Sequence, residues 1–187
     1  MILLEDMMKF NREFVDKKEY EKYQADKYPA KKTAILTCMD TRLTELLPAA
    51  LGIRNGDVKL IKNAGGIISH PYGSVMHSLV IAVYELGVEE VWVIGHDDCG
   101  MQNVDCEALI GHMHQRGITD VDIARSDGAT GGIEEWLRGF GDVNEAVLET
   151  ARIIRNHPLM PRELRVFSLI MDPVTGEVRP AEETEQK

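Results

Sequence analysis

Thr33-Ala34-Ile35-Leu36-Thr37-Cys38 is a short run with a β-branched residue at every second position, and it ends on a cysteine. Such a run predicts a buried strand. Three similar apolar runs follow at 58–62, 91–95 and 164–171, and segments with helical periodicity lie between them. Because strands that alternate with helices form parallel sheets with right-handed crossovers, this order predicts a single α/β domain around a mostly parallel sheet.

The helices are predicted from the spacing of their apolar residues and from the residues at their ends. One of them would begin at Ser74 as its N-cap and end before Gly87. Residues 117–141 are polar and rich in Gly and Asp, so we expect a loop there with one short helix at 133–137. The longer helices are expected at 43–51, 74–86, 101–115 and 142–156.

The N-terminal segment 5–27 is highly charged and carries apolar side chains near the helical period, which predicts an amphipathic helix. It either packs on its own domain or forms an arm on a second subunit, and the residues by themselves favour neither. We divide the chain into a helical arm at 1–28, an α/β domain at 29–180 and a solvated tail at 181–187. The apolar positions of the arm include Met7, Phe10, Phe14 and Tyr20.

Composition and charge narrow the classes of protein to which this chain can belong. Its 187 residues are 44% hydrophobic and 28% charged, as in an ordinary soluble globular domain. With 31 Asp and Glu against 21 Lys and Arg, the net charge of −10 disfavours nucleic acid and anionic membranes as partners. No apolar run reaches the ~20 residues that span a bilayer, and no signal-peptide pattern opens the chain, so we expect a cytoplasmic protein. Three cysteines at long spacings do not form a disulfide framework.

Candidate metal ligands occur in two short runs that each follow an apolar run: Cys38-Met39-Asp40-Thr41-Arg42 and His96-Asp97-Asp98-Cys99. The carboxyl ends of parallel strands meet at one edge of a sheet, where ligands bind. Cys38 and His96 therefore converge if their strands are neighbours, and Cys99 lies one tight turn beyond His96. Two thiolates and one imidazole suit Zn²⁺, and three protein ligands leave a fourth position open. We expect a zinc enzyme that acts through a metal-bound hydroxide.

Asp40 and Arg42 are the charged residues closest in sequence to the first of these cysteines. Their spacing of two allows a bidentate ion pair. Such a pair would hold the carboxylate off the metal and orient it toward the water or hydroxide bound there. Asp40 could instead fill the fourth position on the metal, which would close the site.

These residues together resemble the motifs of a known family, the β-class carbonic anhydrases. Two motifs carry the resemblance: Cys38-x-Asp40-x-Arg42 and Gly95-His96-x-x-Cys99-Gly100. The Lys-Asn-Ala-Gly-Gly segment at 62–66 is similar to that family's Asn-Ala-Gly segment, and the Asp-Cys-Gly-Met segment at 98–101 is similar to its small microbial branch. The combined pattern is far more specific than any of its pieces.

The resemblance implies a role for each residue of the two motifs. Cys38, His96 and Cys99 would bind one Zn²⁺ per chain. Asp40 and Arg42 would form the catalytic dyad, or Asp40 would be the fourth zinc ligand of an inactive, closed state. The family's reaction is the reversible hydration of CO₂ to bicarbonate and a proton.

The resemblance also implies an architecture and an assembly. The family fold is a four-stranded parallel sheet flanked by helices, sometimes with an added edge strand, so we expect four to five strands. Its members form obligate dimers or larger assemblies in which the N-terminal helix reaches across to the partner. This favours a homodimer or higher oligomer in which the arm at 1–28 packs on another subunit.

Two alternative functions share the same predicted zinc site. One is hydrolysis of carbon disulfide or carbonyl sulfide, which are linear molecules like CO₂. The other is a non-catalytic, zinc-stabilised regulatory protein in which Asp40 stays on the metal. The chain departs from the family pattern at Asp97, where a small hydroxyl residue is expected, and Asp98 either pairs with a basic residue or is part of the local structure.

Overall fold

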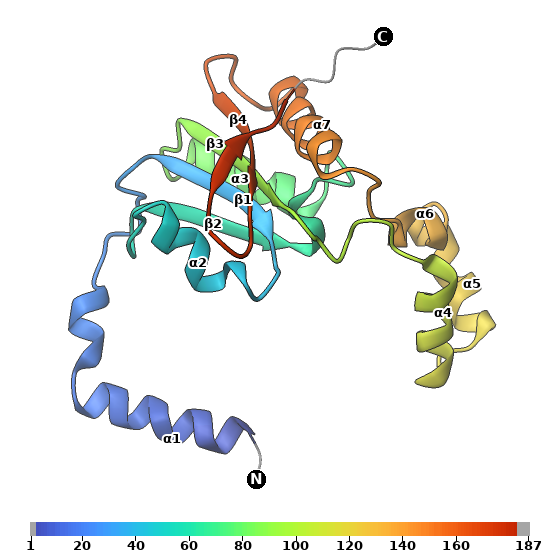
Figure 1. The fold of residues 1–187 in the computed structure, drawn as a ribbon, viewed down its shortest axis with the longest axis horizontal. Helices are drawn as coiled ribbons and strands as arrows, with labels where there is room; N and C mark the ends of the chain where they lie inside the picture. Colours follow the sequence, from blue (N-terminus) through green and yellow to red (C-terminus); the bar gives the residue numbers. More distant parts are fainter. Residues whose placement is uncertain (1–2, 183–187) are drawn as a thin grey trace.

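One five-stranded sheet organises the chain, as Figure 1 shows. A computed structural model describes residues 3–182, apart from the side chains of residues 127, 129 and 130. The strands lie in the order β2-β1-β3-β4-β5, and every neighbouring pair is parallel except β4 and β5. The strands are β1 (Thr33–Cys38), β2 (Val58–Asn63), β3 (Glu90–His96), β4 (Arg165–Met171) and β5 (Val178–Pro180). The predicted mostly parallel α/β fold is confirmed, and β5 is the added edge strand.

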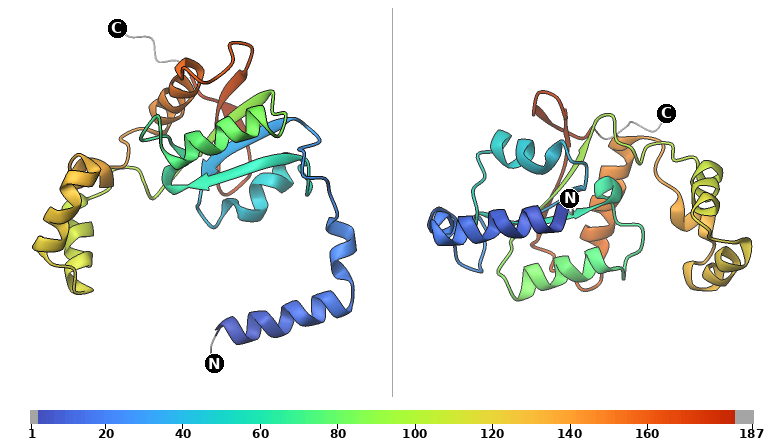
Figure 2. Two further views of the ribbon diagram at one scale, coloured as in Figure 1. Left: turned by 180° about the vertical axis from the view of Figure 1, so that it is seen from behind. Right: turned by 90° about the horizontal axis from the view of Figure 1, so that it is seen from below.

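Helices cover both faces of this sheet (Figure 2). One face packs against α2 (Leu43–Ala50), and the other packs against α3 (Ser74–Tyr84) and α7 (Val143–Asn156). Asp142 is the N-cap of α7 and accepts a hydrogen bond from the Glu145 N–H at 2.9 Å. The sheet is thereby enclosed between two helical layers, as in other doubly covered parallel sheets.

The central position of β1 determines where the first cysteine lies. β1 has neighbours on both sides and is buried throughout. Successive side chains of a strand point to opposite faces. Ala34 and Leu36 accordingly join the core under α3 and α7, and Ile35 joins the core under α2. Burial on both faces fixes the register of β1, and with it the position of Cys38 at the end of the strand.

Two helical segments project from the sheet and its covering helices (Figure 1). The first, α1 (Leu3–Asp16), buries none of its residues and is followed by a 3₁₀-helix, η1 (Glu19–Tyr23). The second consists of α4 (Cys106–Gln115), α5 (Asp120–Thr130) and α6 (Ile133–Leu137). Within residues 3–182, no helix is long and apolar enough to cross a bilayer.

Two predicted helices are shorter than the sequence suggested. The helix expected over 5–27 ends at Asp16, because Lys18 adopts a left-handed conformation with φ 54° that interrupts it. The helix expected over 101–115 begins only at Cys106, after Asp105 caps it by accepting from the Ala108 N–H. In both cases a local backbone turn outweighs a continuous periodic pattern.

Two further differences concern helix starts and an unexpected helix. Gly73, rather than Ser74, is the N-cap of α3. α5 lies within the segment 117–141, where only the short helix at 133–137 was expected. The sequence of α5 gives little sign of a helix, because its few apolar residues form no clear stripe on one side.

Candidate metal centre

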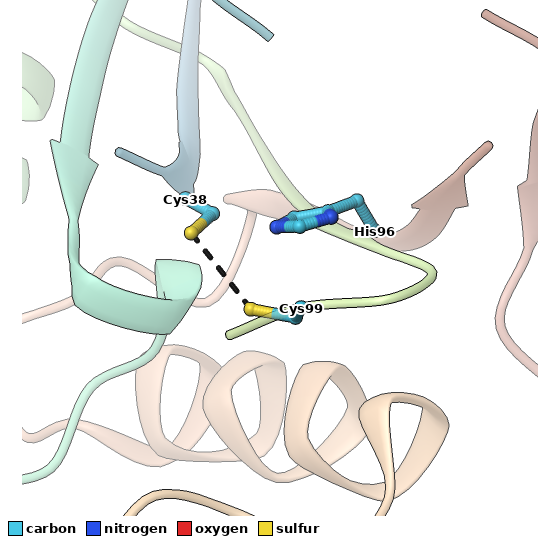
Figure 3. A group of neighbouring side chains, drawn as sticks. All are labelled: Cys38, His96 and Cys99. Atoms are coloured by element: carbon cyan, nitrogen blue, oxygen red, sulfur yellow. Dashed lines mark hydrogen bonds between the residues drawn. The ribbon is translucent and has the colours of Figure 1, made fainter. Parts of the chain in front are cut away.

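The three predicted metal ligands converge at the carboxyl edge of the sheet (Figure 3). β1 and β3 are parallel neighbours, and Cys38 and His96 are their last residues. The chain then turns back through Asp98, whose φ of 53° is left-handed, and brings Cys99 to the same point. The three ligand atoms, two sulfurs and one ring nitrogen, lie within 4.8 Å of one another.

The spacing and burial of this cluster fit a tetrahedral zinc ion. The two sulfur atoms are 3.9 Å apart, and a tetrahedron with Zn–S bonds of about 2.3 Å has an edge of about 3.8 Å. The exposed fractions of Cys38, His96 and Cys99 are 5%, 0% and 6%. Among the described residues, no other group of three or more His, Cys, Asp and Glu side chains is spaced for a metal ion.

The main chain orients the His96 ring toward the sulfurs. The Nδ1–H donates to the carbonyl of Asp97 at 2.8 Å, because a carbonyl can only accept. In the neutral ring Nε2 is then the unprotonated nitrogen, and within the described part of the chain this buried atom has no hydrogen-bond partner. A buried polar atom without a partner is costly, and a metal ion bound between the three side chains would supply that partner.

The two thiols of the cluster hold one proton between them. The hydrogen bond between their sulfurs lowers the pKa of Cys38 and raises the pKa of Cys99. One sulfur is therefore a thiolate near neutral pH through the protein's own hydrogen bonding. Thiolate is the form in which cysteine binds a metal, so one of the two cysteines is already in the protonation state that metal binding requires.

The Asn-Ala-Gly-Gly segment packs directly against the first ligand. Gly66 has φ +66°, and a Cβ placed on it would lie 2.8 Å from the main-chain nitrogen of Cys38. The carbonyl of Asn63 accepts a hydrogen bond from the Met39 N–H at 2.8 Å. Only glycine combines this backbone conformation with this close approach, so the segment supports the backbone around Cys38 from one side.

Asp40 lies beside the cluster and is held by Arg42 in the turn that follows β1. Asp40 Oδ2 is 3.9 Å from His96 Nε2. Arg42 donates to the carboxylate from its main-chain N–H at 2.8 Å, from Nε at 3.1 and 3.3 Å, and from Nη2 at 2.8 Å. These contacts hold the pKa of Asp40 down to about 2, so the carboxylate is ionised throughout the neutral range.

The two acids between His96 and Cys99 are each paired with an arginine. Arg42 donates from Nη1 to Asp98 Oδ2 and from Nη2 to the Asp98 carbonyl, both at 2.8 Å. Asp97 forms a bidentate ion pair with Arg179 of β5, at 2.7 and 2.8 Å. Hydrogen bonding to Arg179 lowers the pKa of Asp97. Both acids are therefore compensated, although they add negative charge next to the metal ligands.

Comparison with known proteins gives the family of this chain. A family model described as carbonic anhydrase matches residues 33–178, which contain both motifs. A crystal structure of a β-carbonic anhydrase isoform from Trichomonas vaginalis superposes with a TM-score of 0.88 at 31% identity, covering 97% of this chain and 98% of that one. The chain belongs to the β-carbonic anhydrase family.

Two curated proteins are similar in sequence to this member of the β-carbonic anhydrase family over most of its length. The candidate carbonic anhydrase YtiB of Bacillus subtilis is 46% identical over 178 residues, which is 95% of each chain. A carbon disulfide hydrolase of Acidithiobacillus thiooxidans is 30% identical over 154 residues, which is 78% of this chain and 75% of that one. The relatives of this chain thus include proteins named for two different reactions.

The residues predicted for the site of this family member lie together, and one residue that touches the site was missed. Cys38, His96 and Cys99 form the cluster, and the Asp40–Arg42 pair stands beside it. Arg179 was not singled out, because it lies 82 positions from Asp97 on a short edge strand. The unusual acid at position 97 was the only sequence signal that could have prompted a search for such a partner.

Proposed function

We propose that this chain is a zinc-dependent carbonic anhydrase that hydrates CO₂ reversibly to bicarbonate and a proton. The position of Asp40 carries the proposal, because its carboxylate stands 3.9 Å from the free ring nitrogen of His96 but is bound by Arg42. With the carboxylate held by Arg42, a metal bound by three ligands would keep its fourth position open. An open position distinguishes a catalytic zinc site from a structural one.

Cys38, His96 and Cys99 would hold the zinc ion through their two Sγ atoms and Nε2. Two thiolates balance the charge of Zn²⁺, so the centre would be close to neutral, which suits its burial. When bound, Zn²⁺ is a Lewis acid that makes a water molecule acidic enough to be the nucleophile. Thiolates donate more electron density than imidazoles, so we expect activity to rise from neutral to alkaline pH.

Asp40 would orient the reacting water by accepting a hydrogen bond at Oδ2. With a pKa of about 2, the carboxylate is an acceptor and not a donor at neutral pH. Such a weak base does not retain a proton, so the proton released by the reaction leaves through solvent or buffer rather than resting on Asp40. Arg42 keeps the carboxylate ionised and aimed at the ligand cluster.

A closed site with Asp40 as the fourth ligand requires the carboxylate to leave Arg42. It would give up its hydrogen bonds to the guanidinium, while Arg42 stays tied to Asp98. The contacts of Arg42 therefore support the open arrangement. We propose the closed form as an inactive state of the enzyme, and not as evidence of a regulatory protein without catalysis.

Hydrolysis of carbon disulfide or carbonyl sulfide is the second candidate function, because the carbon disulfide hydrolase of Acidithiobacillus thiooxidans is 30% identical. CO₂, COS and CS₂ are all linear, and one nucleophile could attack the central carbon of each. The observation that discriminates between them is sulfide release. Zinc-replete protein that consumes CS₂ faster than it hydrates CO₂ would favour the second candidate.

We also propose that the enzyme is a homodimer or a larger assembly joined through α1. Leu3, Met7 and Phe10 of this helix are 60–70% exposed, and none of its residues is buried on its own chain. A continuous apolar face of this kind is uncommon on a monomer and fits a second copy of the chain. The requirement for two reduced cysteines supports a reducing compartment, the cytoplasm.

Metal analysis combined with the pH profile of CO₂ hydration tests the proposed function. We expect one zinc ion per chain and a stopped-flow rate well above the buffer background that increases from pH 7 to pH 9. Protein that holds a full complement of zinc but shows no hydration above background at any pH would contradict the proposal. Sulfide release from CS₂ in the same preparations would then test the second candidate.

A further inference from the structure

The ion pair between Asp97 and Arg179 lies next to the metal ligands but belongs to neither the ligand set nor the Asp40–Arg42 pair. Asp97 accepts from both terminal nitrogens of Arg179, at 2.7 and 2.8 Å. Fork-to-fork geometry of this kind fixes the direction as well as the distance of a contact. The pair therefore constrains the position of Asp97 along the edge of the sheet.

The main chain of Asp97 is the part of the molecule that orients His96. Its carbonyl accepts from His96 Nδ1–H at 2.8 Å, which leaves Nε2 facing the sulfurs. Its N–H donates to the carbonyl of Met171, the last residue of β4, at 3.0 Å. A displacement of Asp97 would therefore rotate or release the imidazole that we assign to the metal.

The backbone of Arg179 is attached to β4, the same strand to which the Asp97 N–H is bonded. β5 pairs antiparallel with β4, and Arg179 lies opposite Ile170 in that register, one position before Met171. The backbone of Arg179 and the main chain of Asp97 are thus both attached to the end of β4. The side-chain pair closes a short ring of contacts between β4, β5 and the ligand loop at 96–99.

The ligand loop needs such support because it contains an unfavourable conformation. Asp98 has φ 53°, a left-handed conformation that few non-glycine residues adopt. Arg42 holds Asp98 from the turn after β1, at 2.8 Å. Arg179 holds Asp97 from β5, so two arginines from different parts of the chain hold consecutive residues of the loop between two ligands.

We propose that Arg179 is a positioning residue for the metal centre, which acts by holding Asp97 so that the carbonyl of Asp97 fixes the His96 ring. This proposal rests on the proposed zinc site. A purely electrostatic role of Arg179 predicts that its removal slows the loss of zinc, because removal of a nearby cation makes the site more attractive to a dication. Positioning instead predicts that removal of Arg179 speeds the loss of zinc.

The test is the rate at which zinc leaves the holoenzyme in the presence of a chromophoric chelator. We expect Arg179→Ala to speed zinc loss about tenfold, the lower end of the effect of outer contacts on metal affinity. Arg179→Lys should fall between Ala and the natural residue, because lysine keeps the charge but not the two-pronged geometry. A rate for Arg179→Ala equal to or slower than that of the unaltered protein would overturn the proposal.

A matched control removes the same type of ion pair at the other end of the sheet. Arg165 of β4 pairs with Glu90 of β3 at 2.5 Å, at the first residue of each strand. Arg165→Ala should leave zinc loss unchanged, even where it lowers the melting temperature as much as Arg179→Ala. Equal acceleration by both variants would show a general structural effect and would refute a positioning role.

A double-mutant cycle tests whether Arg179 acts through Asp97. If it does, Asp97→Asn combined with Arg179→Ala should release zinc no faster than the more severe single variant. If the effects of the two substitutions on the rate of zinc loss are fully additive, Arg179 does not act through Asp97. The Co²⁺-substituted proteins supply a second readout, because a displaced imidazole changes the ligand-field bands. Unaltered protein that binds no zinc would instead refute the proposed function itself, so the two failures are distinguishable.

Discussion

The metal centre and the N-terminal helix differ most clearly in their surroundings. At the carboxyl edge of the sheet, the three ligand side chains are no more than 6% exposed. In α1, Phe10 is 70% exposed and no residue is buried. Within residues 3–182, one chain therefore brings together the proposed metal ligands and the Asp40–Arg42 pair, whereas most apolar side chains of α1 are exposed.

This difference follows from how a strand and an isolated helix are stabilised. β1 and β3 are joined by a ladder of hydrogen bonds and buried in the core, so the ends of both strands are fixed relative to each other. A helix of 14 residues, by contrast, is marginal in water without packing of its apolar face. Substitutions in the two regions should therefore affect different properties of the protein.

The largest effect is expected from Cys38→Ser, which removes a ligand from the buried cluster. The hydroxyl is a poor ligand for Zn²⁺, so zinc should not co-purify with the variant and CO₂ hydration should fall to background. Metal analysis and stopped-flow assay measure both outcomes. Cys106→Ser is the control, since Cys106 lies outside the cluster. Full zinc content in the Cys38 variant would remove this residue from the ligand set.

Asp40→Asn should separate metal binding from catalysis. The amide lacks the negative charge with which the carboxylate accepts a hydrogen bond, so we expect about a 10²–10⁴-fold decrease in kcat with zinc content unchanged. Glu149→Gln is the control, because it alters another acid that is paired with an arginine, on α7 and outside the ligand cluster. Unchanged activity in the Asp40 variant would show that the pair with Arg42 is structural.

Phe10→Asp tests the other half of the comparison, the exposed arm. If α1 packs on a second copy, each of the two arms of a dimer loses a buried phenylalanine worth about 1.5–3 kcal/mol, so the dissociation constant of the dimer should rise roughly 10²–10⁴-fold. Analytical ultracentrifugation measures this change. Asn11→Asp adds the same charge at the neighbouring exposed position and should have little effect. An unaltered assembly in Phe10→Asp would exclude this face from the interface.

The smallest effect is expected from Asp172→Asn in the turn between β4 and β5, directly after Met171 at the end of β4. Hydrogen bonds from the Val174 and Thr175 N–H groups lower the pKa of this carboxylate. A lowered folded-state pKa stabilises the fold above the unfolded pKa of about 4, and this contribution is lost as pH falls through the folded pKa. The melting temperature of the variant should be slightly lower than that of the unaltered protein at pH 7, and this difference should shrink below pH 4. A difference independent of pH would assign the effect to the hydrogen bonds alone.

Much of the sheet and of the metal cluster could be predicted because the relevant signals are local. The apolar run at 33–38 has the same boundaries as the observed β1, and the run at 164–171 contains β4. The ligand types followed from chemistry, since two cysteines and a histidine at strand ends suit few uses other than a metal. α5 was not predicted because its sequence has no clear apolar stripe, although Thr119 and Asp122 cap its N-terminus reciprocally: the Asp122 N–H donates to Thr119 Oγ1 and the Thr119 N–H donates to Asp122 Oδ2.

The sequence by itself determined the kinds of ligand, the strands that carry them and the nearby Asp40–Arg42 pair, because periodicity and close spacing act over a few residues. Only the tertiary structure decided which arginine meets which acid of the ligand loop. Arg42 is 56 positions from Asp98, and Arg179 is 82 positions from Asp97. Such distant partners meet through the order and register of the strands, which place the ends of β1, β3 and β4 and the short strand β5 around one loop.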